Sequence, residues 1–237
     1  MASESAFITG GTGALGRAVT ERFLADGYRV AVTYRSEDEW AALRAQNASA
    51  AGSGSLLGLR ADVTQADSMR AAVEASAGRF GGFRVLIHLA GGYAGGKPVE
   101  SVEEKIVRGM IELNLLSAFW AARYAIPHVK REKDGRLLFV SSRGAVECYP
   151  GAAAYAAAKL GLHALVQTLA KELRENGVTA NAVVPSLIDT PPNRASMPDA
   201  DFTKWVRPEA VAALLAFLAS RAAAATSGAL VPIYGRA

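Results

Sequence analysis

Short apolar runs alternate with longer stretches of helical periodicity along the whole of this sequence. In the first such stretch Leu15, Val19 and Phe23 recur every four residues, and Gly27 stands where a C-terminal helix cap belongs. The runs are apolar nearly throughout, as expected of strands that helices cover on both faces. The sequence therefore predicts an α/β fold of three layers, in which a doubly wound, mostly parallel sheet of seven strands has helices on both faces. The runs are AFIT at 6–9, YRVAVTY at 28–34, SLLGLRA at 55–61, RVLIHLA at 84–90, RLLFVS at 136–141, VTANAVV at 178–184 and ALVPIY at 229–234.

The length of the chain predicts its domain organisation. A chain of 237 residues can bury one substantial core, and α/β folds of this size are commonly undivided, so we expect residues 1–237 to form a single domain. Residues 189–206 contain three prolines and no clear periodicity, which predicts a substrate loop or lid. The Gly/Ser/Ala stretch at 48–55 predicts a loop, and the alanine run at 222–225 predicts the end of a helix.

Charge and composition exclude several classes of function. The net charge is +4, but the basic residues are scattered, so we expect no nucleic-acid partner. No apolar run approaches the roughly 20 residues of a membrane-spanning helix, and the N-terminal residues lack the pattern of a secretory leader. The single cysteine, Cys148, cannot form an internal disulfide and suits a reducing compartment. We therefore expect a cytoplasmic protein that acts on a small molecule and holds no metal.

The sequence TGGTGALG, from Thr9 to Gly16, joins the first expected strand to the first expected helix. Gly10, Gly13 and Gly16 would let the backbone approach a pyrophosphate, and the helix N-terminus offers free N–H groups and the positive end of its dipole. In this context the motif predicts a dinucleotide site in a Rossmann fold. A glycine-rich turn without a ligand is the alternative.

The residue at the end of the second expected strand predicts which dinucleotide is bound. An acidic side chain usually bonds the ribose hydroxyls of NAD at this position, but here it is Arg35. A guanidinium suits a 2′-phosphate, because it forms charge-assisted, bidentate hydrogen bonds. We therefore predict a preference for NADP(H). NAD(H) is the alternative, with Arg35 on the surface of a loop and Glu37 or Asp38 on the ribose.

Tyr155 and Lys159 are four residues apart at the start of an expected helix, which places both side chains on one side, one turn apart. A phenol titrates near 10, so acid–base chemistry near neutrality requires stabilisation of its phenolate. Lys159 can supply the positive charge. A surface pair is the alternative, but the glycine-rich turn and the Ser–Ser–Arg sequence upstream favour a catalytic pair.

Over essentially its whole length the chain resembles the short-chain dehydrogenase/reductase family. The resemblance depends on TGGTGALG, on LAGG after the fourth expected strand and on PSLIDT at 185–190. It also depends on Ser142, Tyr155 and Lys159. Alanine and serine replace the usual glycines at 14 and 186. The resemblance implies cofactor contacts at Gly10, Thr12, Gly13, Leu15, Gly16, Asp62, Val63, Ala90, Gly91, Tyr155, Lys159, Pro185, Ile188 and Thr190.

The same resemblance implies a mechanism. A hydride passes from the nicotinamide to a carbonyl carbon while Tyr155 protonates the alkoxide. Ser142 is expected to hydrogen-bond the carbonyl oxygen, and Lys159 to hold the nicotinamide ribose and lower the pKa of the tyrosine. Asn114 is expected to anchor a water that links Lys159 to solvent. The alternative is that the Asn114 amide lies inside a helix and only bonds the backbone. The resemblance also implies a homotetramer or dimer, formed through the helices around Asn114 and after Tyr155.

The stretches AGGYAGGK at 90–97 and LIDTPPNRASMPDADFTKW at 187–205 are similar to those of dihydropteridine reductases. Arg35, Ser142 and Asn114 depart from that pattern, so reduction of a ketone, quinone or 3-oxoacyl compound is the main prediction. A dihydropteridine reductase-like activity is one alternative, and a non-catalytic NADP-binding sensor is another. A serine hydrolase is disfavoured, because the G-x-S-x-G motif is absent around Ser142. The candidates for an apolar substrate wall are Tyr93, Val146, Cys148, Tyr149, Met197 and Trp205.

Overall fold

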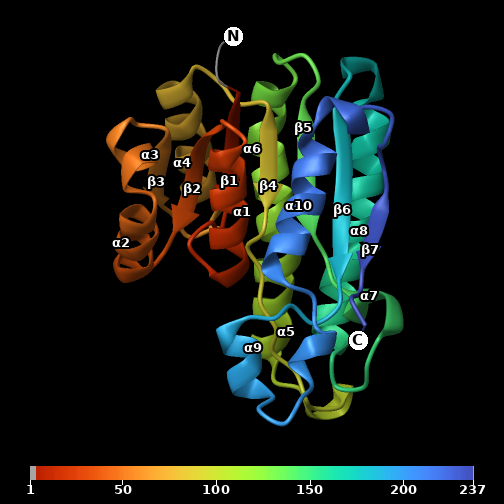
Figure 1. The fold of residues 1–237 in the computed structure, drawn as a ribbon. Helices are drawn as coiled ribbons and strands as arrows, with labels where there is room; N and C mark the ends of the chain where they lie inside the picture. Colours follow the sequence, from red (N-terminus) through yellow and green to blue (C-terminus); the bar gives the residue numbers. More distant parts are fainter. Residues whose placement is uncertain (1–3, 237) are drawn as a thin grey trace.

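Seven strands form one parallel sheet in the computed structural model, which describes residues 4–236 (Figure 1). Every neighbouring pair is parallel, and the strand order is β3-β2-β1-β4-β5-β6-β7. The predicted α/β doubly wound fold is therefore confirmed, and all seven apolar runs form strands. The strands are β1 Ser5–Thr9, β2 Arg29–Tyr34, β3 Leu56–Arg60, β4 Val85–His88, β5 Arg136–Val140, β6 Thr179–Pro185 and β7 Leu230–Ile233.

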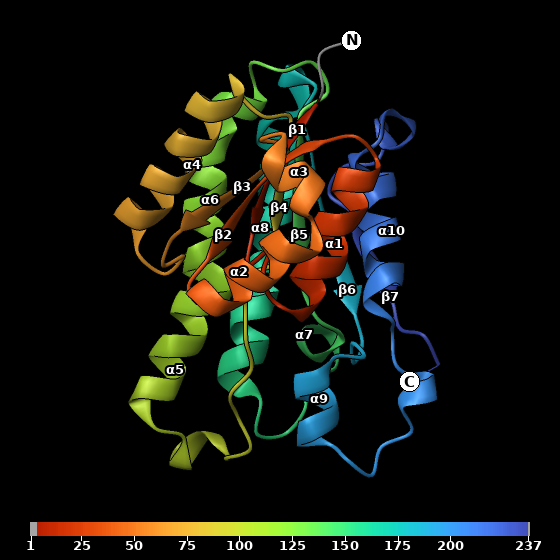
Figure 2. The ribbon, with the colours of Figure 1, turned by 60° about the vertical axis from the view of Figure 1, so that its left-hand side comes forward.

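Helices cover both faces of this sheet, with α4, α6 and α8 on one side and α1 and α10 on the other (Figure 2). Among residues 4–236 no helix combines the length and the apolar character needed to cross a bilayer. The helices are α1 Ala14–Ala25, α2 Glu37–Gln46, α3 Ala48–Gly52, α4 Ala66–Phe80, α5 Glu104–Ile111, α6 Ser117–Val129, α7 Arg143–Glu147, α8 Ala153–Glu172, α9 Pro191–Ser196 and α10 Pro208–Ala219. A π-helical segment, Glu112–Leu116, joins α5 to α6, and 3₁₀ turns occupy Val99–Ser101, Arg174–Asn176, Phe202–Lys204 and Arg221–Ala223.

The core divides into two apolar clusters because successive strand residues point to opposite faces of the sheet. In β1, Phe7 packs with the residues of α4, α6 and α8, whereas Ala6 and Ile8 pack with those of α1 and α10. In α1, Val19 and Phe23 are fully buried, as their spacing predicts. Burying one such side chain stabilises the fold by about 1.5–3 kcal/mol. Strands apolar on both faces are what a sheet between two helical layers requires.

Two local predictions are wrong. The stretch at 48–55 contains the short helix α3, because its alanines favour helix; α3 ends at Gly52, and Gly54 after it has φ +75°. The alanine run at 222–225 lies beyond α10, which ends at Ala219 and is followed by the 3₁₀ turn Arg221–Ala223. Within 189–206 the structure also contains α9 and the turn Phe202–Lys204.

The glycine-rich turn packs closely against its surroundings, so that side chains would not fit at several of its positions. Gly10 has φ +68°, a left-handed conformation, and approaches Ala90 after β4. A Cβ on Gly16 would lie 2.1 Å from the carbonyl oxygen of Gly10. At Gly13 the same oxygen would be 3.5 Å from a Cβ, which is ordinary contact. The start of α1 therefore lies directly against the turn only because residue 16 has no side chain.

We expect Gly16→Ala to lower the free energy of unfolding by about 1–3 kcal/mol, because the new methyl group must displace the backbone. Gly13→Ala is the matched control, and its free energy of unfolding should change by less than about 1 kcal/mol. Urea unfolding followed by circular dichroism measures both. Equal losses in the two variants would show that the contact at Gly16 is unimportant.

Candidate active site

A cleft of about 350 Å³ lies at the carboxyl ends of the strands, where the strand order reverses between β1 and β4. Such a reversal is the usual ligand-binding position of a doubly wound sheet. The cleft brings together nine of the residues predicted to bind a cofactor, which are Gly10, Thr12, Gly13, Leu15, Gly16, Arg35, Val63, Ala90 and Gly91. Ala14, Thr33, Tyr34, Glu39, Ala61, Leu89 and Leu113 complete its wall.

The end of this cleft beside β2 carries charged side chains. Arg35 is exposed, and its positive charge helps to lower the pKa of Asp62, although the hydrogen bonds from Thr64 are the larger cause. Asp62 Oδ1 accepts bonds from the Thr64 backbone N at 3.0 Å and its hydroxyl at 2.7 Å. The carboxylate in the cleft wall is Glu39, which the sequence analysis did not select. The Thr12 hydroxyl donates to Glu39 Oε2 at 2.9 Å.

A second cleft of about 360 Å³ continues the first over the start of α1. The two share Thr12, Ala14 and Glu39, and the second reaches Thr190 at the start of α9. The Thr190 hydroxyl caps α9 by accepting from Asn193 N at 3.4 Å. Two other residues predicted to flank a nicotinamide, Pro185 and Ile188, line neither cleft; Pro185 ends β6, and Ile188 forms a parallel bridge with Val206.

Tyr155 lies in the first turn of α8, near the Ser142 side chain. Burial raises the pKa of Tyr155 and outweighs the lowering effect of Ser142; the nearby Tyr93 adds to the rise. The Tyr93 ring meets the Tyr155 ring edge-on, with centroids 5.2 Å apart. Desolvation disfavours the phenolate and so opposes the lowering of the Tyr155 pKa that was expected from Lys159.

Lys159 is buried one helical turn after Tyr155, with only 5% of its surface exposed. Its Nζ donates to the Val140 carbonyl at 2.9 Å and lies 6.0 Å from the centroid of the Tyr155 ring. Burial lowers the pKa of Lys159 to about 8. A Cβ on Gly91 would lie 3.3 Å from this Nζ and 2.9 Å from Asn114 Oδ1. The cleft wall at Gly91 thus lies directly against both side chains.

Asn114 is buried in the π-helical segment between α5 and α6. Its Oδ1 accepts from Gly92 N at 3.1 Å, and its Nδ2 donates to the carbonyls of Gly92 at 2.9 Å and Met110 at 3.1 Å. The amide therefore bonds backbone groups, which the sequence analysis kept as the alternative. The π segment is a feature that periodicity does not predict, and such segments are frequent at functional sites.

His88 at the end of β4 is a buried residue that the sequence analysis missed. Its Nδ1 lies 2.9 Å from the Thr9 hydroxyl, and its Nε2 lies 3.1 Å from the Ser117 hydroxyl. Ser117 in turn donates to the Leu113 carbonyl at 2.5 Å. Thr9 Oγ1 also accepts from the backbone N–H groups of residues 89 and 90. One imidazole therefore links β1, β4 and the π segment beneath the cleft.

The predicted substrate wall is brought together only in part. Tyr93 reaches Tyr155 and is 63% exposed, and Val146 and Tyr149 are exposed beside α7. Cys148 is exposed and has φ +51°. Met197 is half-buried after α9. Trp205, in contrast, is buried, with its ring against that of Phe202 at 4.8 Å.

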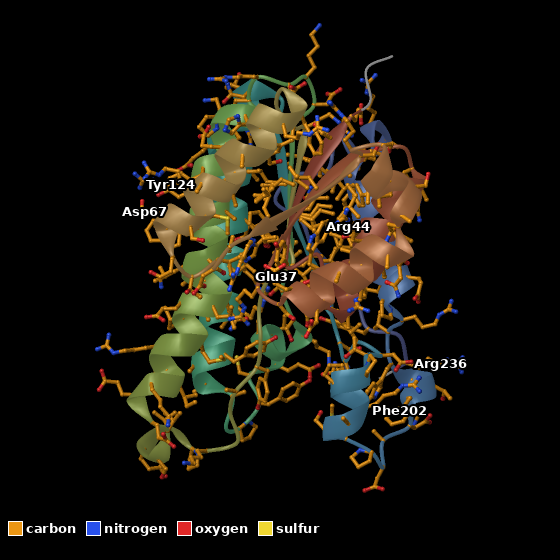
Figure 3. The ribbon with its side chains drawn as sticks, turned by 90° about the vertical axis from the view of Figure 1, so that its left-hand side faces the viewer. Glu37, Arg44, Asp67, Tyr124, Phe202 and Arg236 are labelled. Carbon is orange, nitrogen blue, oxygen red and sulfur yellow. The ribbon has the colours of Figure 1, made fainter. Side chains whose placement is uncertain are left out.

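The 189–206 segment is held by contacts at both of its ends. Asp189 receives two hydrogen bonds from Arg194, at 2.5 and 2.7 Å. Arg236 N donates to the Lys204 carbonyl at 3.0 Å, and Figure 3 shows Arg236 and Phe202 near each other at the end of the molecule that carries α9. The Asp189–Arg194 bonds lie within the segment, and the Arg236 bond attaches it to the residues that follow β7.

Comparisons with known proteins agree on one family. The sequence profile of the short chain dehydrogenases matches residues 4–201. The chain is 34% identical to the 3-oxoacyl-[acyl-carrier-protein] reductase MabA of Mycobacterium bovis, over 98% of this chain and 92% of that one. It is 32% identical to a 3beta-hydroxysteroid dehydrogenase of Eggerthella lenta, over 93% and 88%. A short-chain dehydrogenase/reductase structure from Serratia marcescens superposes with TM-score 0.89, at 30% identity over 99% and 98%.

The His88 network generates a prediction about acid stability. Burial lowers the pKa of His88 to about 3, so that below about pH 6.5 only the unfolded chain takes up this proton. Stability is therefore lost as the pH falls from about 6.5 toward 3. Between pH 7 and about 4.5 the wild type should lose about 2–3 kcal/mol more than His88→Gln, which keeps polar atoms but does not titrate. Urea unfolding at each pH tests this, and parallel losses in the two proteins would contradict it.

Proposed function

Because this chain belongs to the short-chain dehydrogenase/reductase family, whose members interconvert alcohols and carbonyl compounds, we propose that it is an NADP(H)-dependent carbonyl reductase. The observation that carries this proposal is the grouping of Tyr155 with Ser142 and with Lys159, whose Nζ lies against the cleft wall at Gly91. Nicotinamide supplies the hydride when it is bound. Tyr155 delivers the proton to the developing alkoxide, and Ser142 hydrogen-bonds the same oxygen.

The protonation states support a reductive direction. A raised pKa keeps the proton on Tyr155 at neutral pH, which is the form that can protonate an alkoxide. Lys159, with a pKa of about 8, is mostly charged at neutral pH, and its ammonium stabilises the phenolate left after proton transfer. Asn114 is a positioning residue in this scheme, because its amide bonds the backbone of Gly92 and so holds the preceding Gly91 against Lys159.

We assign NADP(H) as the preferred dinucleotide because Arg35 is exposed in the cleft wall at the end of β2, where the adenosine ribose is expected. In this proposal the glycine-rich turn binds the pyrophosphate, and Val63 contacts the adenine from the same cleft wall. NAD(H) stays the alternative. A non-catalytic NADP sensor would share the cleft, and turnover of any carbonyl compound would exclude it.

The substrate class follows from the exposed side chains around Tyr155. Tyr93, Val146 and Tyr149 are apolar or aromatic, which favours a ketone, a quinone or a 3-oxoacyl compound. The names of the 3-oxoacyl reductase and hydroxysteroid dehydrogenase relatives agree with this range. The Tyr93 ring against Tyr155 keeps a flat dihydropteridine as the second candidate. In this proposal residues 1–237 act as one cytoplasmic domain, and 189–206 is the lid.

Tyr155→Phe should lose at least about 100-fold in turnover while its affinity for NADPH changes little, because only the acid is removed. NADPH oxidation at 340 nm is followed with diketones, quinones, a 3-oxoacyl thioester and quinonoid dihydropterin, and NADPH affinity is measured by calorimetry. Turnover comparable to the wild type in this variant would refute the mechanism, and wild-type binding without turnover on any substrate would favour the sensor.

We also propose a homo-oligomer, a dimer or a tetramer, formed through the π segment, α6 and α8. Leu116 is 36% exposed, and Phe119 and Leu160 are each 44% exposed. An exposed apolar group of this kind is typical of a surface that binds another copy.

Phe119→Glu should shift the oligomer toward a smaller species, because two carboxylates would then face an apolar surface. Light scattering after size exclusion measures the mass. Leu187→Glu, a matched change of a residue that is 38% exposed elsewhere, should leave the mass unchanged. A wild-type protein that elutes as a monomer contradicts the oligomer.

A further inference from the structure

The first turn of α2 has an unusual hydrogen-bond arrangement. Ser36 caps the helix and accepts from Glu39 N at 3.3 Å. In a capping box, the glutamate three residues later returns its carboxylate to the backbone of the serine. Here the Glu39 carboxylate accepts from the Thr12 hydroxyl at 2.9 Å instead. Thr12 is only 3% exposed and lies in the glycine-rich turn, so it holds the carboxylate against that turn.

The three consecutive acids at the start of α2 have different surroundings. Glu37 lies near the Tyr34 hydroxyl, whose pKa burial and this carboxylate raise, and its Oε1 lies 4.0 Å from an Arg60 guanidinium nitrogen. Glu37 and Asp38 line a separate hollow on another side of α2, and Figure 3 shows Glu37 at the beginning of that helix. Of these three, Glu39 alone lines the dinucleotide cleft, in the same wall as Arg35. The sequence analysis named Glu37 or Asp38 as the alternative acid on the ribose, and neither of them lines this cleft.

We propose that Glu39 is a specificity-determining residue that opposes Arg35 in selecting the dinucleotide, an inference that depends on the proposed function. A guanidinium attracts a 2′-phosphate, whereas a fixed carboxylate repels it and accepts hydrogen bonds from an unphosphorylated ribose. Since both charges line one cleft, the preference for NADPH over NADH is smaller than Arg35 alone would produce. This chain therefore uses both dinucleotides, with NADPH ahead by a modest factor.

Glu39→Gln isolates the charge, because the glutamine Oε1 can still accept from the Thr12 hydroxyl while the negative charge is gone. The dissociation constants of NADPH and NADH are measured by calorimetry at low and high salt. We expect the ratio of the NADH constant to the NADPH constant to rise about fivefold in Glu39→Gln. High salt should reduce this difference, since both side chains are partly in contact with solvent.

Glu37→Gln is the matched control, because it removes the same charge two residues away, outside the cleft wall. Its ratio should equal that of the wild type. An unchanged ratio in Glu39→Gln overturns the inference, and so does a rise of similar size in Glu37→Gln, which would indicate a general charge effect. If the wild type binds neither dinucleotide, the proposed function itself is overturned. An unchanged ratio in Glu39→Gln, or a similar rise in Glu37→Gln, overturns only the role of Glu39 and leaves the proposed function intact.

Discussion

Close contacts between backbone segments at the end of β1 constrain where the first helix and the cleft can lie. The turn after β1 approaches Ala90 after β4 at Gly10 and passes directly beneath the first turn of α1 at Gly16. Because neither contact leaves room for a side chain, α1 begins at the mouth of the cleft with its free N–H groups facing it. The reversal of strand order at the same place opens the cleft between β1 and β4.

A second layer of contacts beneath the cleft connects the turn to the candidate catalytic residues. His88 bonds Thr9 on one side and Ser117 on the other, and Ser117 bonds the Leu113 carbonyl in the π segment. That segment presents Asn114 to Gly92, so the position of the cleft wall depends on a buried polar network. Each member has a partner, which is the condition under which buried polar groups give one defined arrangement.

The fold was predictable from the sequence, whereas the direction of individual side chains was not. Strands apolar on both faces and the motif TGGTGALG were sufficient for the sheet, its layers and the cleft. The helix α3, the π segment and the His88 network depend on tertiary contacts that periodicity does not encode. The direction of the Glu39 side chain depends on its hydrogen bond with Thr12, a residue 27 positions earlier in the chain. For Tyr155, a motif reveals the neighbouring cation but not the extent of burial, which raises the pKa of the phenol.

The requirement for glycine at position 91 arises from the candidate site and not from the strand before it. Its backbone does not have the positive φ that favours glycine, so the chain itself would accept a side chain there. The first atoms that a Cβ would meet are Asn114 Oδ1 and Lys159 Nζ. The Val140 carbonyl accepts a hydrogen bond from the buried Lys159 Nζ. Because Gly91 has no side chain, this Nζ also lies next to the cleft. The glycine thus leaves this buried ammonium close to both the Tyr155 ring and the cleft.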